Sequence, residues 1–223
     1  MVDVLWQPSL LGQVDASGDP TFDAAFTSAE RRELSAGAWI DVVPRWCDGH
    51  DELFERVLAA GGWHQHDMQM YGEVVIQPRL NATWGTRDLP AGLSVLHEAV
   101  ELLSRRYRTA LDRVTANLYR DGDDAVAWHG DTHLRDRDEA VVAVLTLGTA
   151  RAFHLRPREG GPSIKLQPQP GELVVMGGTC QRTWQHAVPR TRRPVGPRSC
   201  VLFRHHPDRP PSQRARGGHV LGT

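Results

Sequence analysis

Two histidines, one aspartate and two arginines in the C-terminal half of the chain are spaced in a way that suggests metal-dependent chemistry. His129 and Asp131 are separated by a single residue, and His186 follows further along. Two imidazoles and one carboxylate form a ligand set that holds iron(II) in sites with open coordination positions. Arg198 and Arg204 lie six residues apart, and guanidinium groups bind carboxylates. These residues predict an iron site beside a site for a dicarboxylate co-substrate.

The metal ligands are expected on two strands. Residues 125–131 alternate like a strand, so His129 and Asp131 should point to the same face. A second strand within 180–188 supplies His186. This donor set suits iron(II) better than structural zinc, although imidazole also binds zinc, copper and nickel.

Two further pairs of polar residues each share a face of a predicted strand. On 198–204 the even spacing puts both arginines on one side, where their planar forks could hold a carboxylate. On 114–119 the same holds for Asn117 and Tyr119, whose side chains can donate hydrogen bonds to a carboxylate. The alternative for both pairs is an exposed, solvated position.

Taken together, these segments resemble the AlkB family of Fe(II)- and 2-oxoglutarate-dependent dioxygenases, which remove alkyl groups from nucleic-acid bases. The resemblance covers about 113–204 in register and 36–112 more loosely. The matching segments are 117–122, 128–131, 145–148, 151–153, 171–178, 181–189 and 198–204.

The resemblance implies a role for each matching residue. The catalytic iron ligands are His129, Asp131 and His186, and the 2-oxoglutarate contacts are Asn117, Tyr119, Arg198 and Arg204. On the substrate side it implies Arg79 as a phosphate contact, Trp84 as a stacking aromatic, and positions for Trp128 and His133. The cofactor is Fe(II), with 2-oxoglutarate and O2 as co-substrates.

Two positions depart from the family pattern. His133 stands where the family typically has an acidic residue that contacts the methylated base. It could instead be a fourth metal ligand, if the strand continued, or an exposed loop residue. Cys200 stands where the family often has an asparagine near the co-substrate. The preferred base is therefore open, whereas iron and 2-oxoglutarate binding should be retained.

Composition favours one intracellular domain. The 223 residues suffice for a single domain with a substantial core. The sequence has no run of 18 apolar residues and no signal peptide, so we expect a cytoplasmic location, no membrane contact and a monomer. The three cysteines are widely spaced, which argues against disulfides and a zinc knuckle.

The net charge of -1 conceals an asymmetry along the chain. Residues 1–60 hold eleven acidic against four basic side chains, and residues 190–223 hold eight arginines against one aspartate. The basic end could neutralise phosphates or be a solvated, disordered tail.

The expected fold is mainly β with flanking helices, of the α+β class. A strand at 38–43 and a helix at 48–60 capped by Asp48 precede a second helix at 92–110. Eight short strands then suit a double-stranded β-helix, or jelly roll, whose outer face the helices cover. These strands are 113–119, 125–131, 140–148, 151–155, 163–167, 172–176, 183–188 and 198–204.

The chain is accordingly divided into four parts. These are an N-terminal extension (1–37), a region with a strand, helices and a substrate lid (38–112), the jelly-roll core (113–206) and a disordered tail (207–223). The lid is placed at about 62–90, N-terminal to the jelly roll, because that stretch is long, aromatic and without periodicity. Its aromatic residues could stack on an extruded base, or simply pack the loop down.

The function implied by the resemblance is oxidative demethylation of bases such as 1-methyladenine or 3-methylcytosine in DNA or RNA, with release of formaldehyde and succinate. A same-fold oxygenase acting on a small molecule or protein is the nearer alternative. A non-catalytic jelly-roll protein that holds zinc or no metal is the more distant one.

Overall fold

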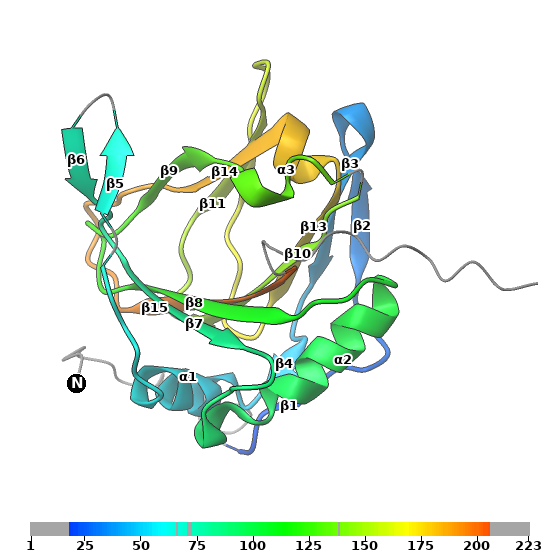
Figure 1. Ribbon diagram of the computed structural model, residues 1–223, viewed down its shortest axis with the longest axis vertical. Coiled ribbons are helices and arrows are strands. Elements are labelled where there is room, and N and C mark those ends of the chain that lie inside the picture. Colours follow the sequence, from blue (N-terminus) through cyan, green and yellow to red (C-terminus); the bar gives the residue numbers. More distant parts are fainter. Residues whose placement is uncertain (1–17, 66, 71–72, 138, 206–223) are drawn as a thin grey trace, which may run out of the picture.

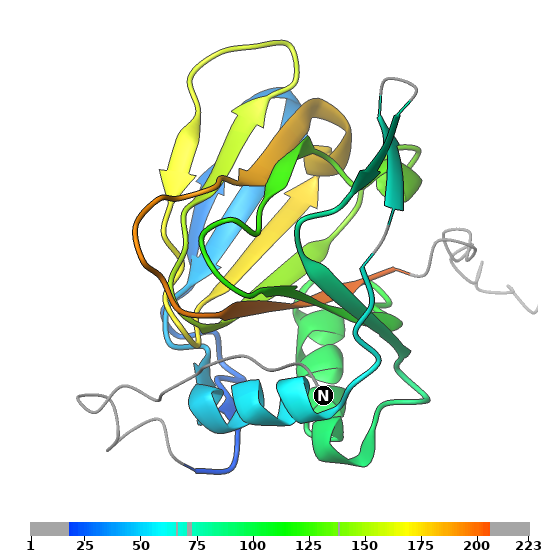
Figure 2. The same cartoon turned by 90° about the vertical axis from the view of Figure 1, so that its left-hand side faces the viewer.

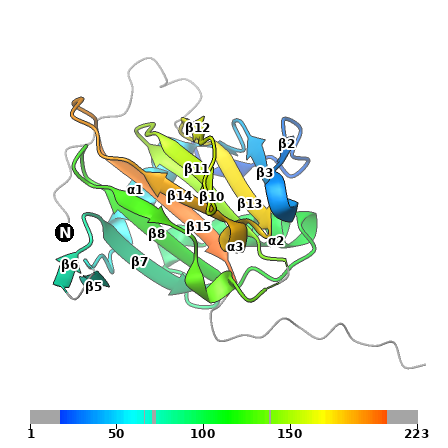
Figure 3. The same ribbon diagram turned by 90° about the horizontal axis from the view of Figure 1, so that it is seen from above.

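The computed structural model describes residues 18–205 except 66, 71–72 and 138, and its centre is a pair of facing β-sheets. Figure 1 shows the seven-stranded sheet between the four-stranded sheet and the helices α1 and α2. The large sheet has the order β2-β3-β13-β10-β15-β8-β7 and the small sheet the order β12-β11-β14-β9. Figure 3 shows the small sheet stacked over the large one.

Along the chain from β8 onward, the strands alternate between the two sheets except for β11 and β12, which follow each other in the small sheet. Strands β8, β10, β13 and β15 belong to the large sheet, and β9, β11, β12 and β14 belong to the small sheet. This is the jelly-roll arrangement expected from the sequence. The strands are β8 (Arg113–Tyr119), β9 (Val126–His129), β10 (Val142–Gly148), β11 (Phe153–Pro157), β12 (Ile164–Leu166), β13 (Leu173–Gly178), β14 (Trp184–Val188) and β15 (Arg198–Arg204).

The large sheet extends beyond the eight jelly-roll strands and takes in three earlier segments. It includes β2 (Glu30–Glu33), β3 (Ala38–Val43) and β7 (Leu80–Gly85). Strand β7 lies within the stretch expected to be a lid, and β2 lies within the expected N-terminal extension. Pairing with β8 and β3 makes both segments part of the large sheet.

The remaining part of the expected lid contains a small β-hairpin. Strands β5 (Asp67–Met70) and β6 (Glu73–Ile76) pair with each other in a separate two-stranded sheet. Figure 2 shows this hairpin projecting beside the large sheet and the small sheet. A further two-stranded sheet joins β1 (Thr21–Phe22) to β4 (Cys47–Asp48).

The alternation of residues on β8 creates two different faces. Val114, Ala116 and Leu118 point toward the helices and join the apolar layer beneath the large sheet. Asn117 and Tyr119 point the other way, toward the space between the sheets. Because successive side chains of a strand point to opposite faces, this one strand serves both the core and the candidate site.

Two amphipathic helices cover the outer face of the large sheet, as expected. Helix α1 (His50–Ala59) and helix α2 (Leu96–Arg106) bury apolar side chains against it, among them Leu53, Phe54 and Leu103. The expected cap by Asp48 is wrong, because the residue before α1 is Gly49 in a left-handed conformation and no side chain caps the helix. Helix α3 (Cys180–Thr183) and the 3-10 helices η1 (Ser35–Gly37), η2 (Ala91–Leu93) and η3 (Thr132–Leu134) are short turns.

A polar cluster around the buried Asp41 connects strands β2 and β3 to the residue that follows α2. Asp41 accepts two hydrogen bonds from Arg31, at 2.7 and 2.9 Å, and one from the hydroxyl of Tyr107 at 3.0 Å. The Trp39 ring lies between the Arg31 guanidinium and the Tyr107 ring.

None of the helices in the described part of the chain has the length and apolar character needed to cross a membrane. The expected basic tail at 207–223 lies outside the described residues.

Candidate metal and co-substrate site

The three residues expected to bind metal come together between the two sheets. Within the described residues, the possible ligand atoms of His129, Asp131 and His186 all lie within 4.8 Å of one another. His129 on β9 and His186 on β14 are direct partners across the two strands, with ring centroids 4.2 Å apart. Asp131 follows β9, where the strand has already ended. Two elements of the small sheet and the turn after β9 therefore build the cluster.

Glycine at position 130 allows the chain after β9 to approach α3 and the start of β14 closely. Gly130 is buried, and a Cβ atom there would lie 2.6 Å from the Gln181 carbonyl oxygen and 3.1 Å from that of Trp184. Both distances are shorter than an ordinary van der Waals contact. Gly130 is not among the residues with positive φ. Glycine is therefore required between the two ligands because a side chain would not fit there, and not because of the backbone conformation.

Hydrogen bonds orient the first two ligands. The Nδ1 atom of His129 lies 2.9 Å from the carbonyl oxygen of Ala127. Since a carbonyl only accepts, Nδ1 carries the proton and Nε2 keeps its lone pair for a metal. The backbone NH of Asp131 donates to Oε1 of Gln181 at 2.9 Å. Gln181 is a positioning residue that the sequence analysis missed.

The electrostatics suit a divalent cation. Burial lowers the pKa of His186 to about 3 and also lowers that of His129, so both imidazoles are neutral at neutral pH. Burial would raise the pKa of Asp131, but Arg204 and the two histidines outweigh it and bring the pKa to about 2. Two neutral nitrogen donors and one ionised carboxylate are the form in which these groups bind a metal.

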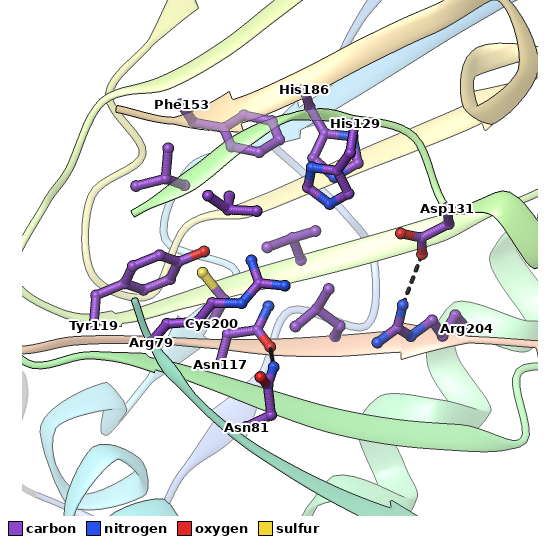
Figure 4. A pocket seen from close by; sticks show the side chains of 14 residues that line it. Arg79, Asn81, Asn117, Tyr119, His129, Asp131, Phe153, His186, Cys200 and Arg204 are labelled. Carbon is purple, nitrogen blue, oxygen red and sulfur yellow. Dashed lines mark hydrogen bonds and ion pairs between the residues drawn. The ribbon is translucent and has the colours of Figure 1, made fainter. Parts of the chain in front are cut away.

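Strands β8 and β15 supply the residues expected to hold 2-oxoglutarate. Asn117, Tyr119 and Arg204 line one pocket together with Cys200 and the three candidate ligands, and Figure 4 shows them facing it. Their register explains this, because Tyr119 pairs with Arg198 and Asn117 pairs with Cys200. Arg198 is fully buried and is not one of the residues that line the pocket. The pocket also contains residues that the sequence analysis did not select, including Asn81, whose amide donates to Asn117.

Arg198 is fully buried next to Tyr119 and has unused hydrogen-bonding capacity. Its guanidinium carbon lies 5.4 Å from the Tyr119 ring centroid, and Nη2 donates to Thr146 at 3.3 Å. Nε and Nη1 have no hydrogen-bond partner within the described residues. Because buried donors without partners are unfavourable, this arrangement fits a carboxylate ligand. Arg204 instead binds Asp131 at 2.7 Å and Thr115 at 2.8 Å.

Four residues were expected on the substrate side, and the structure puts only one of them in the pocket. Arg79 lines it. Trp84 lies on the opposite face of β7 from Asn81 and packs against Trp63 and the apolar layer under the large sheet. Trp128 is not among the pocket residues either, because it stacks under Arg156, whose guanidinium carbon is 4.2 Å from its ring centroid.

His133 lies outside the metal cluster. Strand β9 ends at His129 and the chain then turns into η3. His133 therefore does not share the strand face of His129, and it is exposed. The metal-ligand alternative is therefore wrong among the described residues, where the cluster contains only His129, Asp131 and His186.

Comparison with known proteins identifies the family. A family model described as the 2OG-Fe(II) oxygenase superfamily matches residues 47–214. The chain belongs to this superfamily. Its members use Fe(II) with 2-oxoglutarate and O2, and the donor set and the buried arginines described above fit this cofactor and co-substrate.

The curated relatives support the AlkB resemblance. The alpha-ketoglutarate-dependent dioxygenase alkB homolog 3 of Mus musculus is 30% identical over 174 residues, which cover 69% of this chain and 60% of the relative. The protein of the same name from Bos taurus is 28% identical over 191 residues, covering 76% and 64%. The DNA oxidative demethylase ALKBH2 of Mus musculus is 26% identical over 200 residues, or 79% of each protein. The chain thus spans about three fifths of the alkB homolog 3 proteins.

Solved structures confirm the fold. The structure of OsALKBH1 has a TM-score of 0.55 and 14% identity, covering 79% of this chain and 100% of that one. A prolyl hydroxylase from Trichoplax adhaerens has a TM-score of 0.52 and 16% identity, covering 69% and 76%. At these identities the likeness concerns the jelly roll alone.

Proposed function

We propose that this protein is an Fe(II)- and 2-oxoglutarate-dependent dioxygenase that demethylates alkylated bases, such as 1-methyladenine and 3-methylcytosine, in DNA or RNA. The products are the repaired base, formaldehyde, succinate and CO2. The observation that carries the proposal is that two histidines and one aspartate lie together between the sheets, in a pocket that Arg79 and Arg204 also line and next to the buried Arg198. The names of the relatives, alkB homolog 3 and DNA oxidative demethylase, favour nucleic acid as the substrate.

Each residue of the site has a proposed role. His129, Asp131 and His186 hold Fe(II), which together with 2-oxoglutarate and O2 supplies the oxidising chemistry. Arg198 pairs through its free Nε and Nη1 with a carboxylate of 2-oxoglutarate, while Asn117 and Tyr119 donate hydrogen bonds to it. Gln181 holds the backbone of Asp131 in place. The apolar lining, Val144, Phe153 and Leu202 among it, keeps water away from the reacting atoms.

His133 is proposed to influence which base is accepted. It follows the ligand Asp131 by two residues and is exposed, at the sequence position where the family has an acidic contact to the base. A neutral imidazole offers one acceptor nitrogen, in contrast to the acceptor-only carboxylate. This difference keeps open a second candidate function, the hydroxylation of a small molecule or protein by the same site.

The test is formaldehyde release from methylated oligonucleotides, measured together with succinate formation from 2-oxoglutarate. We expect both products with Fe(II), and neither for His186→Ala. The matched control is His154→Gln, a histidine of β11 outside the pocket, which should retain activity. Succinate without formaldehyde from any DNA or RNA substrate would favour the second candidate function. Loss of neither product in His186→Ala would refute the assignment of the site.

The cellular setting is also part of the proposal. We infer a cytoplasmic monomer that meets nucleic acid directly. Size-exclusion chromatography with light scattering tests the monomer, and a dimer at micromolar concentration would contradict it.

A further inference from the structure

Arg79, a cation in the candidate pocket, interacts with the Tyr119 hydroxyl but has no carboxylate partner among the described residues. Arg79 precedes β7, and its guanidinium reaches into the middle of the pocket between Tyr119 and the candidate metal ligands (Figure 4). Its Nε is buried and has no hydrogen-bond partner within the described residues. An inward-pointing cation of this kind differs from the phosphate contact that the sequence analysis expected, because a contact to the nucleic-acid backbone would extend outward.

The backbone around Arg79 is held firmly, so its direction is a property of the fold. The carbonyl of Pro78 accepts a hydrogen bond from the NH of Ala125 at 2.8 Å, next to the start of β9. On the other side, Leu80 begins the pairing of β7 with β8 opposite Leu118. Arg79 is thus anchored between the strand that carries the first metal ligand and the strand that carries Asn117 and Tyr119.

The charges around the pocket call for an anion. Arg79 and Arg204 line the pocket, Arg198 is buried next to the pocket residue Tyr119, and each carries one positive charge. Asp131 is the only carboxylate among the residues that line the pocket in the described part of the chain. Asp131 is already paired with Arg204 at 2.7 Å. Two arginines are therefore left without a counter-charge, and 2-oxoglutarate is a dianion at neutral pH. A bound divalent metal increases the positive excess further.

We propose that Arg79 is a third arginine for the co-substrate, which pairs with 2-oxoglutarate together with Arg198 instead of contacting the phosphates of the nucleic acid. This inference rests on the proposed function, because it takes 2-oxoglutarate as the anion that enters the pocket. Arg79 joins the co-substrate from the β7 side, opposite the buried Arg198 on β15. Its fork can donate two hydrogen bonds to one carboxylate, which lysine cannot reproduce.

The experiment measures binding rather than turnover. The dissociation constant of 2-oxoglutarate is determined by calorimetry with Mn²⁺ in place of Fe(II) and without nucleic acid, for wild type, Arg79→Gln and Arg79→Lys. We expect Arg79→Gln to weaken 2-oxoglutarate binding by about tenfold or more, as for the loss of a charge-assisted hydrogen bond, and Arg79→Lys to lie between. The control is Arg156→Gln, an arginine stacked on Trp128 outside the pocket, which should bind 2-oxoglutarate like wild type.

A second measurement separates this role from a contact with the substrate. The affinity for a methylated single-stranded oligonucleotide is measured for the same proteins in the absence of 2-oxoglutarate. Unchanged oligonucleotide affinity in Arg79→Gln, with weakened 2-oxoglutarate binding, supports the proposal. An unchanged 2-oxoglutarate constant in both Arg79 variants overturns it while leaving the proposed function intact. No 2-oxoglutarate binding by wild type would overturn both, and thermal denaturation of each variant shows whether it is folded.

Discussion

The substitution Gly130→Ala tests whether the metal site depends on the close approach of the chain after β9 to α3. The added carbon would lie 2.6 Å from the Gln181 carbonyl oxygen, against 3.4 Å for an ordinary contact, so the two segments must move apart by about 0.8 Å. Overpacking of this kind costs about 1–3 kcal/mol. In a domain of this size the expected fall in Tm is about 2–12 °C.

The same movement should damage the metal site more than it damages the fold. The three ligand atoms lie within 4.8 Å of one another, and metal-ligand distances tolerate deviations of only about 0.2 Å. Gln181, whose carbonyl is displaced, also binds the Asp131 backbone. We therefore expect the affinity for Co²⁺, used as a stand-in for Fe(II), to fall by about 10- to 100-fold, the range seen when groups that orient ligands are altered.

Two measurements decide the outcome, a thermal denaturation curve and a Co²⁺ titration followed by visible absorption. The matched control is Gly92→Ala in η2, where an added Cβ would meet nothing within 4 Å, and it should behave like wild type in both. If Gly130→Ala and Gly92→Ala have the same Tm and the same Co²⁺ affinity, the steric account of the glycine between the two ligands is wrong.

Three further substitutions test the energetics of the fold and the site. Because Arg204 helps to lower the pKa of Asp131 to about 2 from 3.8, the pair stabilises the protein above about pH 4 and less as the pH falls toward 2. Arg204→Met should therefore lower the free energy of unfolding in urea by about 2 kcal/mol at pH 7, and a loss of the same size at pH 2.5 would contradict this. Tyr107→Phe removes the 3.0 Å hydrogen bond to Asp41 and should cost about 1 kcal/mol; an unchanged urea midpoint would argue against it. Phe54→Ala, at a fully buried position of α1, should cost about 3–5 kcal/mol, and a cost below 1 kcal/mol would show that Phe54 does not pack as described.

Strands with a regular period of two were predictable from the sequence. The bounds of β3, β8 and β15 agree with the expected ones, because apolar side chains alternate along them or fill them completely. The same alternation correctly predicted that Asn117 and Tyr119 share a face, as do Arg198 and Arg204. On β8 one face packs into the apolar layer under the helices and the other faces the pocket, so successive side chains meet different surroundings and the period of two is clear.

The irregular pairing of β9 was not predictable from the sequence. Val126 and His129 both line the pocket although they are three residues apart, because the pairing of β9 with β14 shifts its register between His186 and Val188. Trp128 lies outside the pocket because it is the strand neighbour of His129 and points to the opposite face, which counting along the strand would have shown. Trp84 was misplaced for a simpler reason, since β7 was taken for a loop. Along β7, Asn81 points to one face and Ala82 and Trp84 point to the other. This alternation could have identified the buried face of the strand.

The division of the site between two sheets has a consequence for how the protein opens. The co-substrate residues lie on β8 and β15, in the interior of the seven-stranded sheet, whereas the first metal ligand lies on β9, the last strand of the four-stranded sheet. Strand β9 pairs with β14 at only two registered positions. Amide hydrogen exchange should therefore be faster in β9 than in β8. A bound divalent metal should slow the exchange of β9 more than that of β8. The metal would then be held by a strand that dissociates from β14 well before the seven-stranded sheet unfolds.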